Sequence, residues 1–226
     1  MASHLDLEEQ EQLDQLKAFW KRWGNLITWG LTLALAAFAG WNAWNWYQRD
    51  QAVKAGAMFD ELDRAAQSGD ADKAGRVFAD LKERYPRTSY AAQAALQAAK
   101  VQFDKGQLDA AQASLNWAAE NAQDDSYRDV ARLRLAGLLM DGKKFDDAAK
   151  VLDAIKSPDF VALQADRRGD LFKLQGKPEQ AKAEYKKAFA DMDKTQDYRH
   201  LVEAKLAALG VNTAEDAASA PAGAGK

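Results

Sequence analysis

The stretch Gly106-Gln-Leu-Asp-Ala-Ala111 recurs in altered form at three other places in the chain. Each copy starts at a turn residue and carries an alanine five places later. The other copies are Gly69-Asp-Ala-Asp-Lys-Ala74, Lys143-Lys-Phe-Asp-Asp-Ala148 and Gly176-Lys-Pro-Glu-Gln-Ala181. The alanines at positions 74, 111, 148 and 181 are therefore 37, 37 and 33 residues apart. Periods of this length indicate an internal structural repeat.

Apolar residues follow each alanine four and seven places later, and this spacing puts all three on one face of a helix. We expect the alanine to let the preceding helix cross closely and the larger residue to fill the gap beyond it. Glycine supplies the turn because positive φ costs it little, and in the third copy Asp141-Gly142 is expected to do so one residue earlier. The apolar positions are Phe78, Leu115, Leu152 and Tyr185, then Leu81, Ala118, Ile155 and Ala188.

This spacing resembles the tetratricopeptide repeat, which places a glycine, an alanine, an aromatic residue and a second alanine at these intervals. Pro86 fits the proline that closes a repeat in that family, whereas Gln123, Phe160 and Asp193 stand there in the other copies. The family also prefers a small residue twelve places before the marker alanine. Ala99, Ala136 and Gly169 comply, and Leu62 does not. The resemblance covers about residues 55–195 and implies a helical-hairpin solenoid; an unrelated helical bundle is the alternative.

The pattern from Gln51 to Gly210 is helical throughout, so the fold class is all-α. Gly210 is expected to end the last helix, and the Ala-, Ser-, Gly- and Pro-rich tail from residue 211 is predicted to be disordered. The first helix is expected to continue from the preceding segment because 47–54 holds no helix breaker. Helices are predicted at about 50–67, 70–85, 88–104, 107–121, 125–140, 144–156, 159–174, 178–190 and 197–209.

Upstream of the repeats, residues 23–48 (WGNLITWGLTLALAAFAGWNAWNWYQ) contain no charged side chain. As a helix they rise about 39 Å, and a bilayer core needs about 20 apolar residues. Tryptophans gather at both ends, as in the aromatic belts of membrane helices. The segment is predicted to be a single transmembrane helix; a buried core helix is the alternative. Bulky aromatics at its exit argue against a cleaved signal peptide.

Basic residues set the expected orientation. Lys17, Lys21 and Arg22 precede the span, whereas Arg49 and Lys54 follow it. The excess favours a cytoplasmic N-terminus. The predicted organisation is a cytoplasmic segment at 1–22, the span at 23–48, a repeat domain outside the cytoplasm at 49–210 and the tail at 211–226.

Two features near the membrane have open interpretations. Apolar residues of segment 5–22 form a rough helical stripe that could lie on the membrane, dock on a partner or be a mere extension. Within the span, small residues at four-residue spacing could let another membrane helix approach, or could be ordinary alanine-rich sequence. These small residues are Gly30, Ala34, Ala36 and Gly40.

Composition narrows the function classes. A formal net charge of −3 gives no nucleic-acid signature. The chain has no cysteine and only two histidines, far apart, which argues against thiolate or histidine metal sites. No catalytic motif is present, so we expect no enzyme activity, no cofactor and no small-molecule substrate. The acidic pair Asp146-Asp147 keeps a metal-dependent enzyme as a remote alternative.

Solenoids of this kind bind proteins along their concave surface. In tetratricopeptide proteins the first helix of each pair lines that surface. The resemblance therefore places partner-binding candidates, carried over by position, at Gln93, Lys100, Phe103, Met140, Asp141, Asp166, Asp170 and Lys173.

The order of parts resembles the YfgM family, the ancillary subunits of the bacterial SecYEG translocon. The resemblance rests on the pre-membrane segment Gln15-Leu-Lys-Ala-Phe-Trp-Lys-Arg-Trp-Gly24, on Ala57-Met-Phe-Asp-Glu-Leu62 and on Tyr85-Pro-Arg-Thr-Ser-Tyr90. It implies a bacterial inner-membrane protein with periplasmic repeats. It also implies association with SecYEG and with the membrane-anchored periplasmic chaperone PpiD, to help pass newly translocated proteins to periplasmic folding factors. A scaffold for cell-envelope assembly or division is the alternative.

Overall fold

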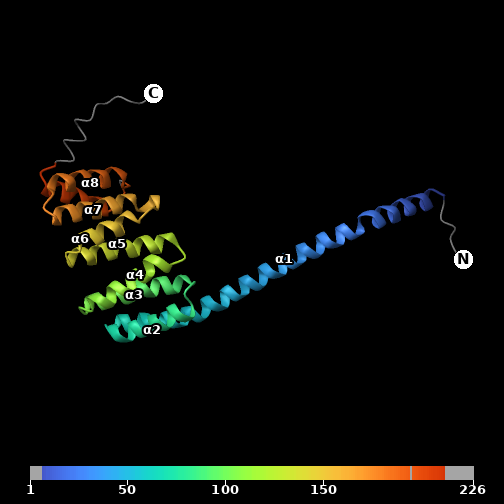
Figure 1. Ribbon diagram of the computed structural model, residues 1–226, viewed down its shortest axis with the longest axis horizontal. Coiled ribbons are helices and arrows are strands. Elements are labelled where there is room, and N and C mark those ends of the chain that lie inside the picture. Colours follow the sequence, from blue (N-terminus) through green and yellow to red (C-terminus); the bar gives the residue numbers. More distant parts are fainter. Residues whose placement is uncertain (1–6, 194, 212–226) are drawn as a thin grey trace, which may run out of the picture. The chain divides into compact units, whose positions relative to one another are not determined.

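The structure is a computed structural model that describes residues 7–193 and 195–211. These residues form helices and connecting turns, without a strand, and confirm the predicted all-α class (Figure 1). The elements are α1 (Leu7–Gln67), α2 (Ala71–Arg84), α3 (Ser89–Asp104), α4 (Leu108–Asn121), α5 (Asp125–Asp141), α6 (Phe145–Asp153), the 3-10 turn η1 (Pro158–Phe160), α7 (Val161–Leu174), α8 (Pro178–Asp191) and α9 (Tyr198–Ala208).

The chain divides into two compact units, Met1–Gln51 and Ala52–Lys226. The described part of the first unit is helical and includes the predicted span. By length and composition this helix could cross a membrane, and none of its most apolar window is buried. Both threonine side chains within the span are satisfied locally. The hydroxyls of Thr28 and Thr32 donate to the carbonyl oxygens of Gly24 and Thr28, each at 2.8 Å, as a helix in lipid requires.

In the second unit, α3 with α4, α5 with α6 and α7 with α8 form successive helix pairs that stack in chain order (Figure 1). All twelve repeat positions that the spacing singles out, from Ala74 to Ala188, are at most 4% exposed. Gly169 shows why a small residue is needed twelve places before the marker alanine. A Cβ atom there would lie 2.4 Å from the ring of Tyr185 on α8.

The corners within the pairs share one geometry. Gly69, Gly106 and Gly176 adopt positive φ, between 70° and 75°. In the third pair the prediction for Gly142 is wrong, because Gly142 has φ −79° and Lys143 takes the left-handed conformation at φ 58°. Each corner is closed by the same backbone hydrogen bonds, such as Lys144 N–H to Leu139 C=O at 2.8 Å. This closure fixes the left-handed residue five places before the alanine.

Helix bounds differ from the prediction mainly between the third and fourth pairs. Helix α6 ends at Asp153 rather than 156, and α7 starts at Val161 after a 3-10 turn that begins with Pro158. The Gln164 amide donates to the carbonyl oxygens of Leu152 at 2.6 Å and Ile155 at 3.3 Å. These bonds satisfy the carbonyl groups that an early helix end leaves free. Ile155 is buried although it lies beyond the helix.

The buried side chains of the second unit form two clusters. The first core extends from Ala55 to Leu171, and the second core from Ala165 to Leu206. Helix α7 contributes to both. The predicted tail lies almost wholly outside the described residues. Its first residue, Val211, packs on the second core and donates its N–H to Leu206 C=O at 3.0 Å, across Gly210 with φ 79°.

Candidate partner-binding groove

A groove of about 900 Å³ lies along the first helices of three successive pairs. It is lined by Ala99, Lys100 and Phe103 of α3, Leu133, Arg134, Gly137, Leu138, Met140 and Asp141 of α5, Arg167, Asp170, Lys173 and Leu174 of α7, and Leu115 of α4. On each first helix the lining residues recur at three- and four-residue spacing, which puts them on one face. The opposite faces of the same helices pack into the cores.

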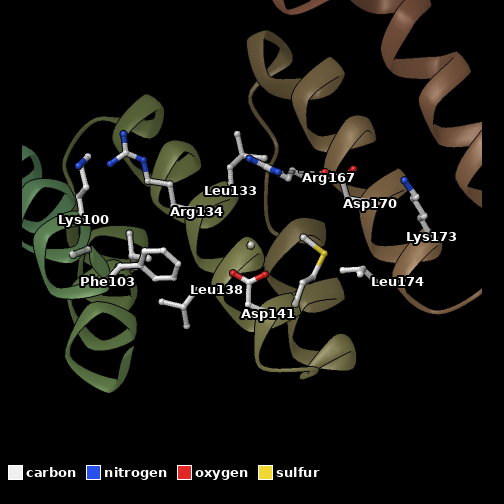
Figure 2. A pocket seen from close by; sticks show the side chains of 14 residues that line it. Lys100, Phe103, Leu133, Arg134, Leu138, Asp141, Arg167, Asp170, Lys173 and Leu174 are labelled. Atoms are coloured by element: carbon white, nitrogen blue, oxygen red, sulfur yellow. Dashed lines mark hydrogen bonds and ion pairs between the residues drawn. The ribbon is translucent and has the colours of Figure 1, made fainter. Parts of the chain in front are cut away.

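The cationic side chains lie on one side of the groove, together with Leu133 and Asp170, and the other labelled apolar side chains lie on the opposite side together with Asp141 (Figure 2). Figure 2 shows the cationic side chains of Lys100, Arg134, Arg167 and Lys173 in one row, with Phe103, Leu138 and Leu174 along the other side. Phe103 and Leu174 are 44% and 56% exposed, so both present apolar surface to solvent. The groove therefore offers an apolar surface beside a row of positive charge.

Six of the eight residues predicted for the concave face line this groove. They are Lys100, Phe103, Met140, Asp141, Asp170 and Lys173. Gln93 is half-buried and lies outside the lining. Asp166 does not fit a partner-contacting role, because its side chain is fully buried and paired inside the domain. Its helical position places it on the face that turns toward α9, not on the open face.

The prediction missed several groove residues that lie on the same helix faces as the predicted ones; each such face forms a stripe along its helix. Arg134 and Leu138 lie seven and three places before the predicted Asp141, and Arg167 lies three places before the predicted Asp170. Extending each stripe by helical periodicity would have found them. The sequence offered no comparable signal for which stripe residues were free of internal ion pairs.

The four cationic side chains of the groove, which we call the cationic row, are Lys100, Arg134, Arg167 and Lys173. Only two of them are paired with a carboxylate of the described residues. Lys100 pairs with Asp104 at 2.8 Å, and Arg167 with Asp170 at 3.2 Å. Arg134 donates to the backbone carbonyl of Leu96 at 3.3 Å, a contact that ties α5 to α3. Among the described residues, no carboxylate forms an ion pair with Arg134 or Lys173.

A buried ionic cluster supports the α7 side of the groove. The Lys205 ammonium group on α9 lies 2.7 Å from the Asp166 carboxylate and 2.8 Å from that of Asp170. The Tyr198 and Tyr185 hydroxyls donate to these two carboxylates at 2.8 and 2.7 Å. Burial, followed by the hydrogen bond to Asp170, raises the pKa of Tyr185 well above its usual value. Burial and the charge of Asp166 likewise raise the pKa of Tyr198. Both phenols therefore act as hydrogen-bond donors at neutral pH.

A second, more polar hollow of about 560 Å³ shares Lys100 with the groove. It lies between α3 and the end of α1, and its lining includes Gln67, Gln97 and Asp104. The Gln97 amide donates to the Asp63 carboxylate at 2.7 Å beside it. The concave side is thus accessible beyond the groove, toward the start of the repeat domain.

The small residues of the span are exposed, and a Cβ atom at Gly30 or Gly40 would meet nothing within 4 Å. At about 100° per residue, the pair Gly30 and Ala34 lies about 120° around the helix from the pair Ala36 and Gly40. The span therefore presents two narrow faces of small residues, and a contact role for either stays a prediction.

Comparison with known proteins covers the span and the groove together. Residues 17–211 match the family model described as a tetratricopeptide repeat-like domain. A curated relative from Neisseria gonorrhoeae, named ancillary SecYEG translocon subunit, is 31% identical over 210 residues, which are 92% of this chain and 100% of the relative. The chain belongs to this family. Relatives of the same name from Haemophilus influenzae and Escherichia coli are 29% and 28% identical, over 80% and 90% of this chain and 89% and 97% of their own lengths.

The family assignment confirms the resemblance to YfgM drawn from three short sequence segments. The matches extend over 100% and 97% of the Neisseria gonorrhoeae and Escherichia coli relatives. The candidate span and the family together fit a single-pass protein of the bacterial inner membrane.

Proposed function

We propose that this family member is a non-enzymatic inner-membrane scaffold that associates with the Sec translocon and with a membrane-anchored periplasmic chaperone of the PpiD type. In this role it helps pass newly translocated proteins to periplasmic folding factors. The observation that carries the proposal is the match, over most of both chains, to relatives named ancillary SecYEG translocon subunit. The repeat-like domain and its groove support a role in protein contacts rather than catalysis.

The proposed orientation is N-terminus in the cytoplasm and repeats in the periplasm. Three basic residues before the span against two after it support this orientation. A reporter fused after residue 226 and active only in the cytoplasm is expected to stay silent. An active reporter would place the repeats in the cytoplasm and remove the periplasmic part of the proposal.

Site-specific photocrosslinking in cells tests the partners. A photoreactive residue at Gly30 or Gly40 is expected to capture a membrane subunit of the translocon, since both positions are exposed in the span. The same residue at Phe103 or Leu174 is expected to capture a periplasmic export factor. Lys187 on α8, exposed and outside the groove, is the matched control position.

Mass spectrometry of the captured products decides between the two scaffold roles. Translocon and chaperone components support the proposal. Capture of cell-division or envelope-assembly proteins at the groove positions, with no translocon component at the span, would replace it with the alternative scaffold.

A further inference from the structure

We propose that the groove between α3, α5 and α7 binds a short polypeptide segment in which acidic side chains alternate with large apolar ones. The inference deepens the partner-binding role proposed above and rests on it. The segment would direct its carboxylates toward Arg134 and Lys173, and its apolar side chains toward Phe103, Leu138 and Leu174.

Charge is the first argument. Lys100, Arg134, Arg167 and Lys173 line the groove against two carboxylates, Asp141 and Asp170. Asp166 and Asp170 share the Lys205 ammonium group, and Asp170 also pairs with Arg167 at 3.2 Å, so these two carboxylates and two cations cancel. Among the remaining charged lining residues, Lys100, Arg134 and Lys173 face Asp141 alone. The row therefore keeps an excess of positive charge, which attracts an acidic segment and repels a basic one.

Two members of the cationic row are available to a ligand. Among the described residues neither Arg134 nor Lys173 has a carboxylate partner. Within residues 7–193 and 195–211, Arg134 donates to the Leu96 carbonyl alone, which leaves other guanidinium donors for a carboxylate. Asp141 lies across the groove from this row (Figure 2) and can accept a backbone N–H of the ligand.

The apolar side is the second argument. Phe103 and Leu174 stay about half exposed at opposite ends of the lining, on α3 and α7. Between them Gly137 on α5 leaves open space, because a Cβ atom there would meet nothing within 4 Å. A ligand side chain can therefore enter at the middle of the groove and cover the apolar residues on both sides.

The alternation of acidic and apolar side chains in the proposed ligand follows from the arrangement of the groove, which has a cationic side and an apolar side. Successive side chains of an extended chain point in opposite directions, so an alternating segment presents acidic groups to one side and apolar groups to the other. Three packed helices at about 8–10 Å spacing extend over about 16–20 Å. Five or six extended residues cover this length at about 3.3 Å each.

The test uses the full chain in lipid nanodiscs and a fluorescein-labelled peptide, Asp-Leu-Glu-Phe-Asp-Leu-Glu-Phe. Fluorescence anisotropy is expected to show saturable binding that weakens as NaCl is raised, because exposed ion pairs are screened. One control peptide carries Lys at the acidic positions, and another carries Ser at the apolar positions. Each is expected to bind at least about tenfold more weakly.

Variants assign the binding to the groove. The double variant Arg134→Glu, Lys173→Glu is expected to weaken the acidic peptide at least about tenfold and to strengthen the Lys peptide. This exchange of preference cannot arise from misfolding. Gly137→Leu, which fills the open space, is expected to block both peptides. Lys187→Glu makes the same charge change outside the groove and is expected to bind as wild type does.

Three results would overturn the inference: equal binding of the acidic and Lys peptides, unchanged binding in the double variant, or displacement of the acidic peptide by laurate at lower concentrations than by unlabelled peptide. The last result would make the groove a lipid site. If peptide binding fails while crosslinks to translocon and chaperone persist, only this inference falls. If the wild-type protein forms no crosslinks to translocon or chaperone components, the proposed function itself is contradicted.

Discussion

The two cores of the repeat domain bury equivalent repeat positions with different chemistry. In the first core, the large residue four places after the marker alanine is Phe78, Leu115 or Leu152, each packed among apolar side chains. In the second core it is Tyr185, whose hydroxyl donates to Asp170. Beside it lies Asp166, which is fully buried and paired with Lys205. At this repeat position the first core is filled by apolar volume alone, whereas the second also engages buried charge. Elsewhere in the first core, α5 buries Asp129, which pairs with Arg132 at 2.7 Å.

The difference follows from position in the stack. A helix pair inside a solenoid is covered on both sides, whereas an end pair needs a cap. Helix α9 caps α7 and α8 through Val202 and Leu206 and through the Lys205 contacts. Apolar contacts are non-directional, whereas an ammonium group held by two carboxylates, each of which also accepts a hydrogen bond from a phenol, fits one docking position. The charge cluster therefore specifies where the cap lies.

The largest expected change in stability comes from removing the cation of this cluster while its carboxylates remain. Lys205→Met leaves Asp166 buried without its counter-charge and should destabilise the second core by about 3–5 kcal/mol. Amides of α9 should exchange with solvent much faster by mass spectrometry, while those of α3 and α4 stay protected. Replacing both partners, as Asp166→Leu with Lys205→Met, should recover most of the loss. Lys187→Met on the surface is the control, expected within about 0.5 kcal/mol of wild type.

The next prediction concerns the close crossing of α7 and α8. Gly169→Ala places a Cβ atom 2.4 Å from the Tyr185 ring, and such overpacking should cost about 1–3 kcal/mol. Gly137→Ala is the matched change within α5, where the new atom meets nothing within 4 Å. It should stabilise the helix by up to about 1 kcal/mol. Urea unfolding followed by circular dichroism measures both. Equal effects would mean that the α7–α8 crossing can widen freely.

The response of stability to alkaline pH is a third property in which the two cores should differ. Because burial and Asp170 raise the folded-state pKa of Tyr185, its contribution to stability is complete below pH 10, near the unfolded value, and declines as pH rises above that. Wild type should therefore lose up to about 1 kcal/mol more than Tyr185→Phe between pH 10 and pH 11. Local exchange in α7–α9 should carry the difference. The same slope in the Tyr185→Phe protein would show that other groups cause it.

Much of the fold could be predicted from the sequence because the repeat positions carry a local signal. Helical spacing alone identified Ala74, Leu115 and Tyr185 as buried. The misses occurred where hydrogen bonds outside the regular helical pattern decide. Helix α6 ends early because Pro158 follows it and Gln164 supplies replacement hydrogen bonds. Lys143 accepts a left-handed conformation because the closing bonds of the corner require it.

The groove could be predicted in outline for the same reason. Lys100, Phe103 and Lys173 follow from which helix of a pair faces the concave side, a property of the repeat. Asp166 shows the limit of that inference. Its partner Lys205 lies 39 residues away, and no local pattern distinguishes a buried, paired aspartate from an exposed one on the same helix.

The smallest expected effect tests whether the cores differ in rigidity as well as chemistry. Gly106 and Gly176 have φ of 75° and 72°, and a Cβ atom at either would meet nothing within 4 Å. Ala at each position therefore adds backbone strain alone, about 1 kcal/mol, if both corners are equally fixed. Lys143→Gly should gain up to about 1 kcal/mol by removing the same strain, less the extra freedom of glycine in the unfolded chain.

Thermal unfolding of the three variants measures the strain in both cores on one scale. Equal losses for Gly106→Ala and Gly176→Ala, mirrored by a gain for Lys143→Gly, mean that corner geometry is independent of what lies beneath it. A much smaller loss at Gly176 would mean that the last pair relaxes around the added atom. In that case the buried charges hold α9 in place while α7 and α8 yield, and the groove would be more deformable at its Lys173 end than at its Phe103 end.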